Sequence, residues 1–218
     1  HPYHAAGVYY IQEPSAMAPA AYLDAQPGEK ILDLCAAPGG KSTQIAAAMR
    51  GEGLLISNEI HPARAKILSE NIERMGIRNA MVTNESPQSL AKVFEAYFDR
   101  IMVDAPCSGE GMFRKNADAC DEWSPENVTL CAERQAEILE CAASMLRPGG
   151  RMVYSTCTFA PEENEGTISQ FLAKHPEFEI ADVMHYPQMS SGVAAWTSDP
   201  QPGLERTIRL FPHHVDGE

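Results

Sequence analysis

The feature that most constrains the fold is an alternation of short apolar runs with longer helix-like segments, which starts at about residue 30. Strand and helix patterns that alternate in this way are typical of βαβ units around a mainly parallel sheet. The sequence therefore predicts the α/β class. The expected strands are residues 30–34, 53–59, 80–83, 98–103, 152–155, 178–183 and 205–211.

Capping residues and prolines mark the expected helix starts. Ser124 can cap a helix whose first turn holds Pro125 and Glu126, because helix starts favour a capping hydroxyl, proline and an acid. Pro62 and Pro161 suit the first turns of two other helices. The expected helices are residues 42–49, 62–75, 124–146 and 161–174.

The composition is that of an ordinary folded domain. The chain has 218 residues, of which 44% are hydrophobic and 22% charged. No apolar run approaches the roughly 20 residues that span a bilayer, and no signal peptide is visible. The six cysteines include no CxxC pair, so we expect reduced thiols in a cytoplasmic protein, with no metal site and no membrane partner. Because the chain begins at His1, we interpret it as a piece of a longer protein.

A glycine-rich turn follows the first expected strand, at Cys35-Ala36-Ala37-Pro38-Gly39-Gly40-Lys41-Ser42. Glycine in such a turn lets a ligand approach the backbone closely, although the turn can also serve only to reverse the chain. A phosphate-binding P-loop is disfavoured because that pattern needs glycine where this chain has Cys35, and the GxGxxG dinucleotide pattern is absent. At the end of the second strand, Glu59 is either a ligand for both ribose hydroxyls of a nucleoside or a solvated surface residue.

Two further motifs place thiols at the ends of neighbouring strands. Asp104-Ala105-Pro106-Cys107-Ser108-Gly109 follows the fourth strand, and Ser155-Thr156-Cys157-Thr158 follows the fifth. Ligands bind beyond the carboxyl ends of the strands in an open α/β sheet, so we expect both motifs to face a cleft. The remaining cysteines, at positions 35, 120, 131 and 141, are interpreted as small buried residues.

Two thiols and a carboxylate are suited to methylation at carbon 5 of a pyrimidine. Carbon 5 is a poor nucleophile, so a thiolate first adds at carbon 6 and pushes electron density to carbon 5. A proton donor near ring N3 assists this addition. After methyl transfer a second group removes the carbon-5 proton, and the first thiol leaves. Position and chemistry leave open which of Cys107 and Cys157 attacks.

The three motifs, in this order, closely resemble those of the NOL1/NOP2/Sun family of RNA cytosine-5 methyltransferases, and within it the bacterial ribosomal RNA methyltransferase F group. The resemblance covers nearly the whole chain, including residues 10–17 and 209–213. It implies S-adenosylmethionine as the cofactor. It also implies a Rossmann-like class I fold, with a mainly parallel seven-stranded sheet, helices on both faces and a last strand that can be missing. Residues 30–218 would form the catalytic domain, and residues 1–29 an N-terminal approach segment.

The resemblance also implies a role for each motif. Cys157 would attack the base, Cys107 would help to release the product, and Asp104 would hold the base. The family's adenine-side aspartate has no counterpart here; Ser86 aligns best with it, and Asn84 is the alternative. The residues implied to bind the cofactor are Cys35, Ala36, Ala37, Pro38, Gly39, Gly40, Lys41, Glu59, Ser86 and Asp104.

The implied partner is RNA, with 16S ribosomal RNA as the first expectation and transfer RNA as the alternative. The protein itself is expected to be a monomer. The formal charge of −13 argues against a broad basic surface. We therefore hypothesise that RNA-binding parts outside this piece make most phosphate contacts, with Arg114 and Lys115 as local positive charges. A non-catalytic RNA-binding factor in ribosome assembly is a competing function, which the two cysteines together with Asp104 argue against. An NTPase is a third, disfavoured by Cys35 in the turn.

Overall fold

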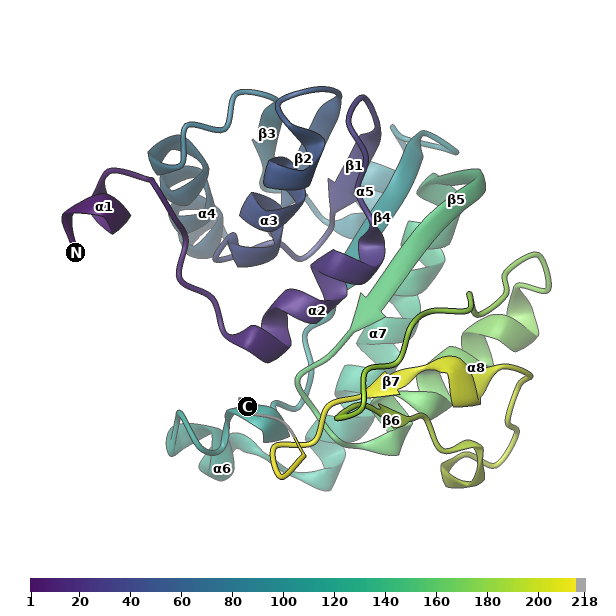
Figure 1. Ribbon diagram of the computed structural model, residues 1–218. Coiled ribbons are helices and arrows are strands. Elements are labelled where there is room, and N and C mark those ends of the chain that lie inside the picture. The colour runs from purple at the N-terminus through teal and green to yellow at the C-terminus, as the bar shows by residue number, and fades with distance from the viewer. Residues whose placement is uncertain (215–218) are drawn as a thin grey trace. The chain divides into compact units, whose positions relative to one another are not determined.

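The computed structural model describes residues 1–214, without the side chain of residue 122. Its main feature is a parallel five-stranded sheet (Figure 1). Its strand order is β3-β2-β1-β4-β5, so the connections reverse direction between β1 and β4. Ligands bind at such a switch point in open α/β sheets. The strands are β1 (Lys30–Asp33), β2 (Leu54–Asn58), β3 (Ala80–Thr83), β4 (Phe98–Asp104) and β5 (Leu146–Ser155).

The chain divides into two compact units. The first consists of residues 1–105 and 141–155 and contains the whole parallel sheet. The second consists of residues 106–140 and the chain from residue 156 onward. Each unit is described by itself.

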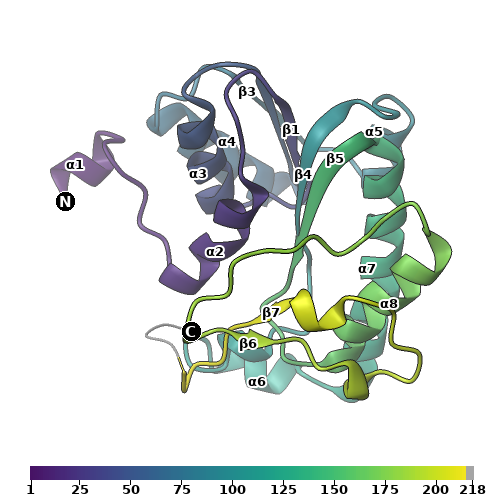
Figure 2. The same cartoon turned by 45° about the vertical axis from the view of Figure 1, so that its right-hand side comes forward.

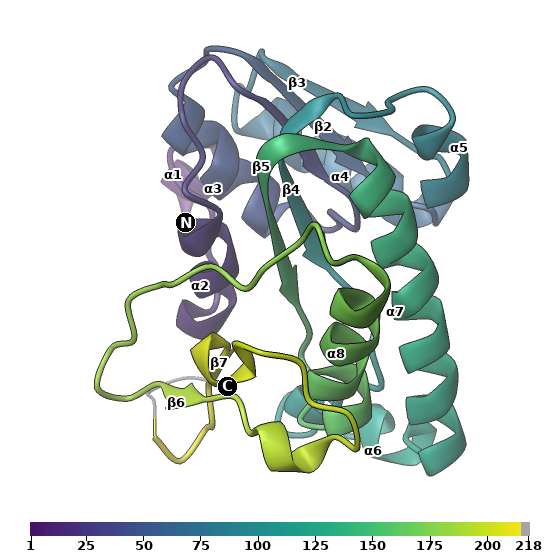
Figure 3. The same ribbon diagram turned by 90° about the vertical axis from the view of Figure 1, so that its right-hand side faces the viewer.

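Helices of the first unit cover both faces of its sheet. Figure 2 and Figure 3 show α2 and α3 on one face and α5 on the other. Ala20 and Leu23 of α2 belong to the same core cluster as Ile31, Ile45 and Leu55. Complete burial of a side chain such as Leu23 contributes about 1.5–3 kcal/mol. The helices of this unit are α1 (Pro2–Ala5), α2 (Pro14–Leu23), α3 (Gly40–Met49), α4 (Pro62–Arg74) and α5 (Pro87–Ala91).

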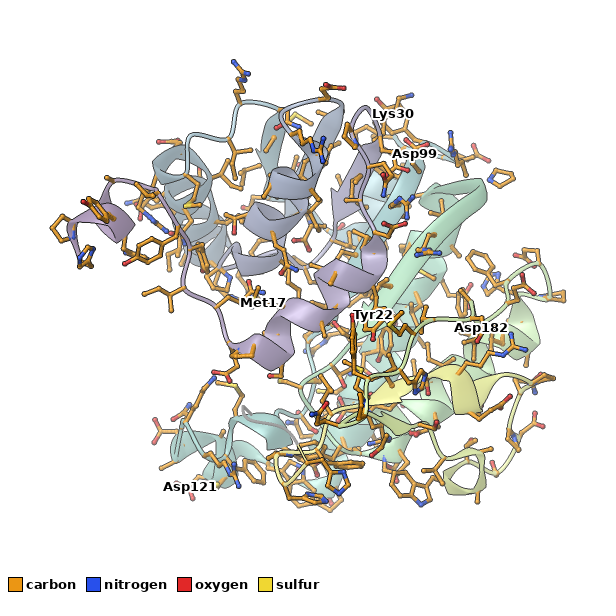
Figure 4. All side chains as sticks on the ribbon, in the orientation of Figure 1. Met17, Tyr22, Lys30, Asp99, Asp121 and Asp182 are labelled. Carbon is orange, nitrogen blue, oxygen red and sulfur yellow. The ribbon has the colours of Figure 1, made fainter. Side chains whose placement is uncertain are left out.

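The two ends of the sheet carry different side chains. At the amino-terminal end, the Lys30 amide donates to Asp99 at 2.6 Å, and Figure 4 shows these two residues side by side. Arg147 pairs with the other oxygen of Asp99 at 2.6 Å. At the carboxyl end, β4 and β5 finish in register, with Asp104 opposite Ser155. Polar side chains of the expected site motifs therefore gather at the carboxyl end.

The second unit contains helices and a two-stranded antiparallel sheet in which β6 lies beside β7 (Figure 2). The expected cap of α7 is confirmed, because the Asn127 amide donates to Ser124 Oγ at 3.1 Å. From this unit α7 continues into the first unit and leads to β5. The elements are η1 (Glu110–Met112), α6 (Asp118–Glu122), α7 (Pro125–Met145), η2 (Pro161–Glu163), α8 (Glu165–Lys174), β6 (Ser190–Ser191), η3 (Ala194–Trp196), η4 (Leu204–Arg206) and β7 (Ile208–Arg209).

The α/β class and the Rossmann-like parallel sheet are confirmed, but the sheet has five strands in the described residues where we expected seven. Residues 178–183 form no regular element; none of them is buried, and the Phe178 ring packs against Phe171 at a centroid distance of 5.0 Å. Of residues 205–211, Ile208–Arg209 alone is extended, and it pairs with β6. The helix expected over 161–174 is divided at Asn164, whose φ of −118° and ψ of −94° are not helical.

Within residues 1–214, no helix combines enough length with enough apolar character to cross a membrane.

Candidate functional site

A pocket in the first unit opens where β1 and β4 end, with a cavity volume of about 210 Å³. This volume is below the roughly 300–1,000 Å³ of common small-molecule sites, so the pocket has room for part of a ligand. Its wall includes Tyr10 and Gln12 from the N-terminal segment and Asp33 from β1. Seven of the ten residues expected to bind the cofactor line it: Cys35, Ala36, Ala37, Pro38, Gly40, Lys41 and Asp104.

The turn between β1 and α3 depends on glycine at two positions. Gly39, which lies outside the pocket lining, has a φ of +114°, a conformation that other residues rarely adopt. A Cβ atom at Gly40 would lie 2.2 Å from Gln12 Oε1, so a larger residue there would displace the Gln12 side chain from the turn. From α4, Arg64 donates to the Ala37 carbonyl at 2.9 Å and holds the turn from its other side.

Two carboxylates in the pocket have different surroundings. Asp104 is ion-paired with Lys41 at 2.8 Å and accepts a hydrogen bond from Ser155 Oγ at 2.7 Å. Asp33 is fully buried; its Oδ2 accepts from Ser42 Oγ at 2.7 Å, and its Oδ1 has no hydrogen-bond partner among the described residues. Burial raises the pKa of Asp33 to about 7 despite the Ser42 hydrogen bond. Because Asp33 lines the pocket, its Oδ1 can accept a hydrogen bond from a cofactor.

The other predicted cofactor residues lie beyond the pocket lining. Glu59 is buried at 3% exposure, and its carboxylate lies 3.5 Å from Arg64 Nη2. Asn84 donates to the Glu59 carbonyl at 2.6 Å. Ser86 instead caps α5, because its Oγ accepts from the Ser89 amide at 3.1 Å. The structure thus brings Asn84 to Glu59 and engages the Ser86 hydroxyl in a helix cap.

The two motif cysteines lie together within the second unit, with their sulfur atoms 3.2 Å apart. The Cys157 amide donates to Cys107 Sγ at 3.3 Å; the Cys157 residue is exposed, whereas Cys107 is half-buried. The hydrogen bond to Cys157, together with burial, raises the pKa of Cys107 well above its ordinary value. Cys107 therefore keeps its proton at neutral pH, and its thiol lies within hydrogen-bonding distance of the Cys157 sulfur.

The remaining cysteines only partly match the expectation of small buried residues. Cys131 is buried at 4% exposure, as expected. Cys120 is exposed, so the expectation is wrong there, because α6 is a five-residue surface helix. Cys141 is half-buried. Cys35 is also half-buried and lines the pocket, and burial raises its pKa so that it remains a thiol.

The sheet order, the switch-point pocket and the likeness to solved methyltransferases define a Rossmann-like, S-adenosylmethionine-dependent methyltransferase domain. The backbone turn and the partnerless Asp33 oxygen suit that cofactor, which carries donor groups on an adenosine-sized body. Residues 20–218 match the family described as 16S rRNA methyltransferase RsmB/F, and the chain belongs to that family.

Individual relatives support the same placement. Ribosomal RNA small subunit methyltransferases F from Klebsiella pneumoniae strain 342 and Vibrio vulnificus strain YJ016 are each 43% identical over 99% of this chain. The chain spans 44% of the length of each. A solved methyltransferase homolog from Pyrococcus horikoshii has a TM-score of 0.84 and 30% identity, covering 100% of this chain and 68% of its own.

A second solved structure bears on the cofactor. NSun6 from Pyrococcus horikoshii, solved with the S-adenosylmethionine analogue SFG, has a TM-score of 0.81 and 28% identity, covering 98% of this chain and 51% of its own. These comparisons confirm the predicted family and S-adenosylmethionine as the cofactor.

Proposed function

We propose that this chain is the catalytic part of an enzyme that methylates carbon 5 of a cytosine in RNA, with 16S ribosomal RNA as the substrate. The observation that carries the proposal is the 3.2 Å separation of the Cys107 and Cys157 sulfur atoms in a member of an rRNA methyltransferase family. S-adenosylmethionine supplies an electrophilic methyl group when bound. Residues 30–218 form the catalytic domain in this proposal, and residues 1–29 lead into it.

Cys157 is the attacking thiol in this scheme. Its sulfur bonds to carbon 6 of the cytosine, and the displaced electron pair makes carbon 5 a nucleophile for the methyl group. The proton of Cys107 favours the Cys157 thiolate before the attack, because the two sulfur atoms are within hydrogen-bonding distance at 3.2 Å. The exposure of Cys157 gives a base access to it.

Cys107 acts in the second half of the reaction. Its pKa is raised chiefly by the hydrogen bond to the Cys157 sulfur and by burial. Once the Cys157 sulfur is bonded to carbon, it carries no negative charge, so Cys107 becomes easier to deprotonate. Cys107 loses its proton to solvent and, as a thiolate, takes the proton from carbon 5, after which the bond between carbon 6 and the Cys157 sulfur breaks and the ring is restored.

Asp104 orients the base in this proposal. An ionised carboxylate accepts hydrogen bonds and can bind the cytosine amino group. Lys41 and Ser155 support this role because both already bind the Asp104 carboxylate, at 2.8 and 2.7 Å. For the cofactor, the turn from Cys35 to Lys41 and the Asp33 oxygen supply contacts, Glu59 binds the ribose, and Asn84 or Ser86 serves the adenine side.

RNA binding must overcome the formal charge of −13. We assign most phosphate contacts to parts of the longer protein outside this chain, since its relatives are more than twice as long. The exposed Arg114 and its neighbour Lys115 add local positive charge. The target cytosine has to leave its stack, which costs a few kcal/mol and least in a loop. In this proposal the protein acts as a monomer in the cytoplasm.

The test is methyl transfer from labelled S-adenosylmethionine to 16S ribosomal RNA, followed by digestion and nucleoside analysis. We expect label in 5-methylcytidine and none with the Cys157→Ala variant. Transfer RNA is the comparison substrate. Label in another nucleoside would contradict the proposed chemistry, and RNA binding without methyl transfer by the full-length protein would favour an assembly factor.

A further inference from the structure

The cysteine pair has a second chemical capacity besides base attack. A disulfide needs a sulfur–sulfur distance of about 2.05 Å, so the 3.2 Å between Cys107 and Cys157 can close with a small movement of the side chains. The six cysteines of the chain are all among the described residues, and none is in a disulfide.

Two carboxylates hold the loops that carry these cysteines. Glu110, which opens η1 after Cys107, accepts a hydrogen bond at 2.8 Å from the amide of Phe159 in the loop after Cys157. Conversely, Glu163, which follows Cys157, accepts from the Ser108 amide at 3.1 Å. Each carboxylate therefore accepts a hydrogen bond from the backbone of the opposite segment. We call Glu110 and Glu163 together the carboxylate clamp.

Buried polar contacts lock the clamp in place. Glu163 is fully buried, and Gln135 of α7 donates to it at 2.7 Å. Between the two loops, Ser108 Oγ and Thr158 Oγ1 are 3.0 Å apart, and both residues are buried. Satisfied buried hydrogen bonds of this kind rigidify a structure, because breaking one leaves an unsatisfied polar group. The short distance between the sulfur atoms is thus imposed by the surrounding network.

We propose that Cys107 and Cys157 form a reversible disulfide when a two-electron oxidant such as hydrogen peroxide reaches the exposed Cys157, and that the carboxylate clamp sets the rate of this closure. One thiol is oxidised to a sulfenic acid while peroxide is reduced to water. The second thiol then attacks that sulfur, so a sulfur–sulfur bond forms and a second water leaves. A dithiol such as dithiothreitol reverses the reaction by exchange.

The disulfide would remove the nucleophile needed for base attack, and this consequence rests on the proposed function. Oxidation would therefore stop methyl transfer, and reduction would restore it. The same proximity that lets Cys107 assist Cys157 makes the pair sensitive to oxidants.

The disulfide itself is tested without any methyl transfer. The full chain is treated with hydrogen peroxide, its thiols are counted, and its peptides are mapped under non-reducing conditions. We expect a loss of two of the six thiols and a peptide that joins Cys107 to Cys157, both reversed by dithiothreitol. Cys120→Ser, at the other exposed cysteine, should keep this linkage, and Cys107→Ser should instead give a sulfenic acid at Cys157 that dimedone traps.

Two outcomes separate this inference from the proposed function. Over-oxidation of Cys157 without linkage, in a protein that methylates RNA before treatment, would overturn the disulfide and leave the function intact. Linkage in a protein that never methylates RNA would contradict the function alone.

The clamp is tested by the rate of linkage under diamide, a thiol oxidant. Removing the clamp in Glu163→Ala should slow closure roughly ten- to a hundredfold, because small displacements of reacting atoms have effects of that size. Glu163→Gln, which keeps one acceptor oxygen, should be intermediate. Melting temperatures are measured in parallel, and Gln135→Ala replaces any variant that fails to fold. An unchanged rate in folded Glu163→Ala would refute the positioning role.

Discussion

The buried carboxyl group of Asp33 makes the stability of the domain depend on pH in a direction opposite to that of most acids. Burial raises its pKa from an ordinary 3.8 to about 7. Between these values the folded chain binds more protons than the unfolded chain, so the contribution of Asp33 is fully present below pH 3.8 and is lost as pH rises through 7. At about 1.36 kcal/mol for each pH unit, the loss amounts to about 4 kcal/mol.

Asp33→Asn isolates this effect. The amide keeps an acceptor for Ser42 but cannot ionise, and it leaves a donor unsatisfied at a pH-independent cost of about 1–3 kcal/mol. Urea unfolding followed by fluorescence, repeated from pH 4 to pH 8, gives the free energy of unfolding of each protein. We expect the variant to gain about 4 kcal/mol relative to the parent across this range. Asp121→Asn, at an exposed position, is the matched control and should show a constant difference. A constant difference for Asp33→Asn would refute the reasoning.

Three further predictions follow from close contacts. A Cβ at Gly111 would lie 2.5 Å from the Cys157 carbonyl, so Gly111→Ala should reduce methyl transfer about tenfold or more with an unchanged circular dichroism spectrum. Arg209→Met leaves Glu165 as an unpaired buried charge and should lower the free energy of unfolding by about 3–5 kcal/mol in urea titrations; a change below 1 kcal/mol would contradict this. Lys41→Met removes a cation from the pocket and should change the affinity for S-adenosylmethionine in calorimetry, whereas unchanged binding would place Lys41 outside the site.

The sequence was informative where local signals agree with the fold. The strands β1 to β4 are largely apolar runs near the expected bounds, whereas β5 begins at Leu146 rather than at residue 152 and includes Pro148-Gly149-Gly150. The motifs that follow β1 and β4 lie at the carboxyl end because parallel strands share that end. Residues 178–183 show the limit of this reasoning. Their apolar residues suggested a strand, but Phe178 packs against an aromatic ring of α8 instead. Side-chain packing of this kind overrides strand propensity.

Contacts between distant residues account for the site features that the sequence did not predict. Gln12 reaches the pocket because it rests on Gly40, and nothing local to either residue signals that approach. The raised pKa of Asp33 comes from burial under neighbouring elements. Ser86 aligned best with the adenine-side aspartate, yet its position before Pro87 is also that of a helix cap, which was the available signal.

The division of labour between the two cysteines is the central claim, and trapping of a covalent complex tests it most directly. Cys107→Ala and Cys157→Ala variants of the full-length protein are incubated with 16S ribosomal RNA and S-adenosylmethionine, then separated under denaturing conditions. With Cys157 attacking and Cys107 releasing, Cys107→Ala should accumulate a protein–RNA adduct and Cys157→Ala should form none. An adduct that accumulates in Cys157→Ala and is missing in Cys107→Ala would reverse the roles and contradict the mechanism.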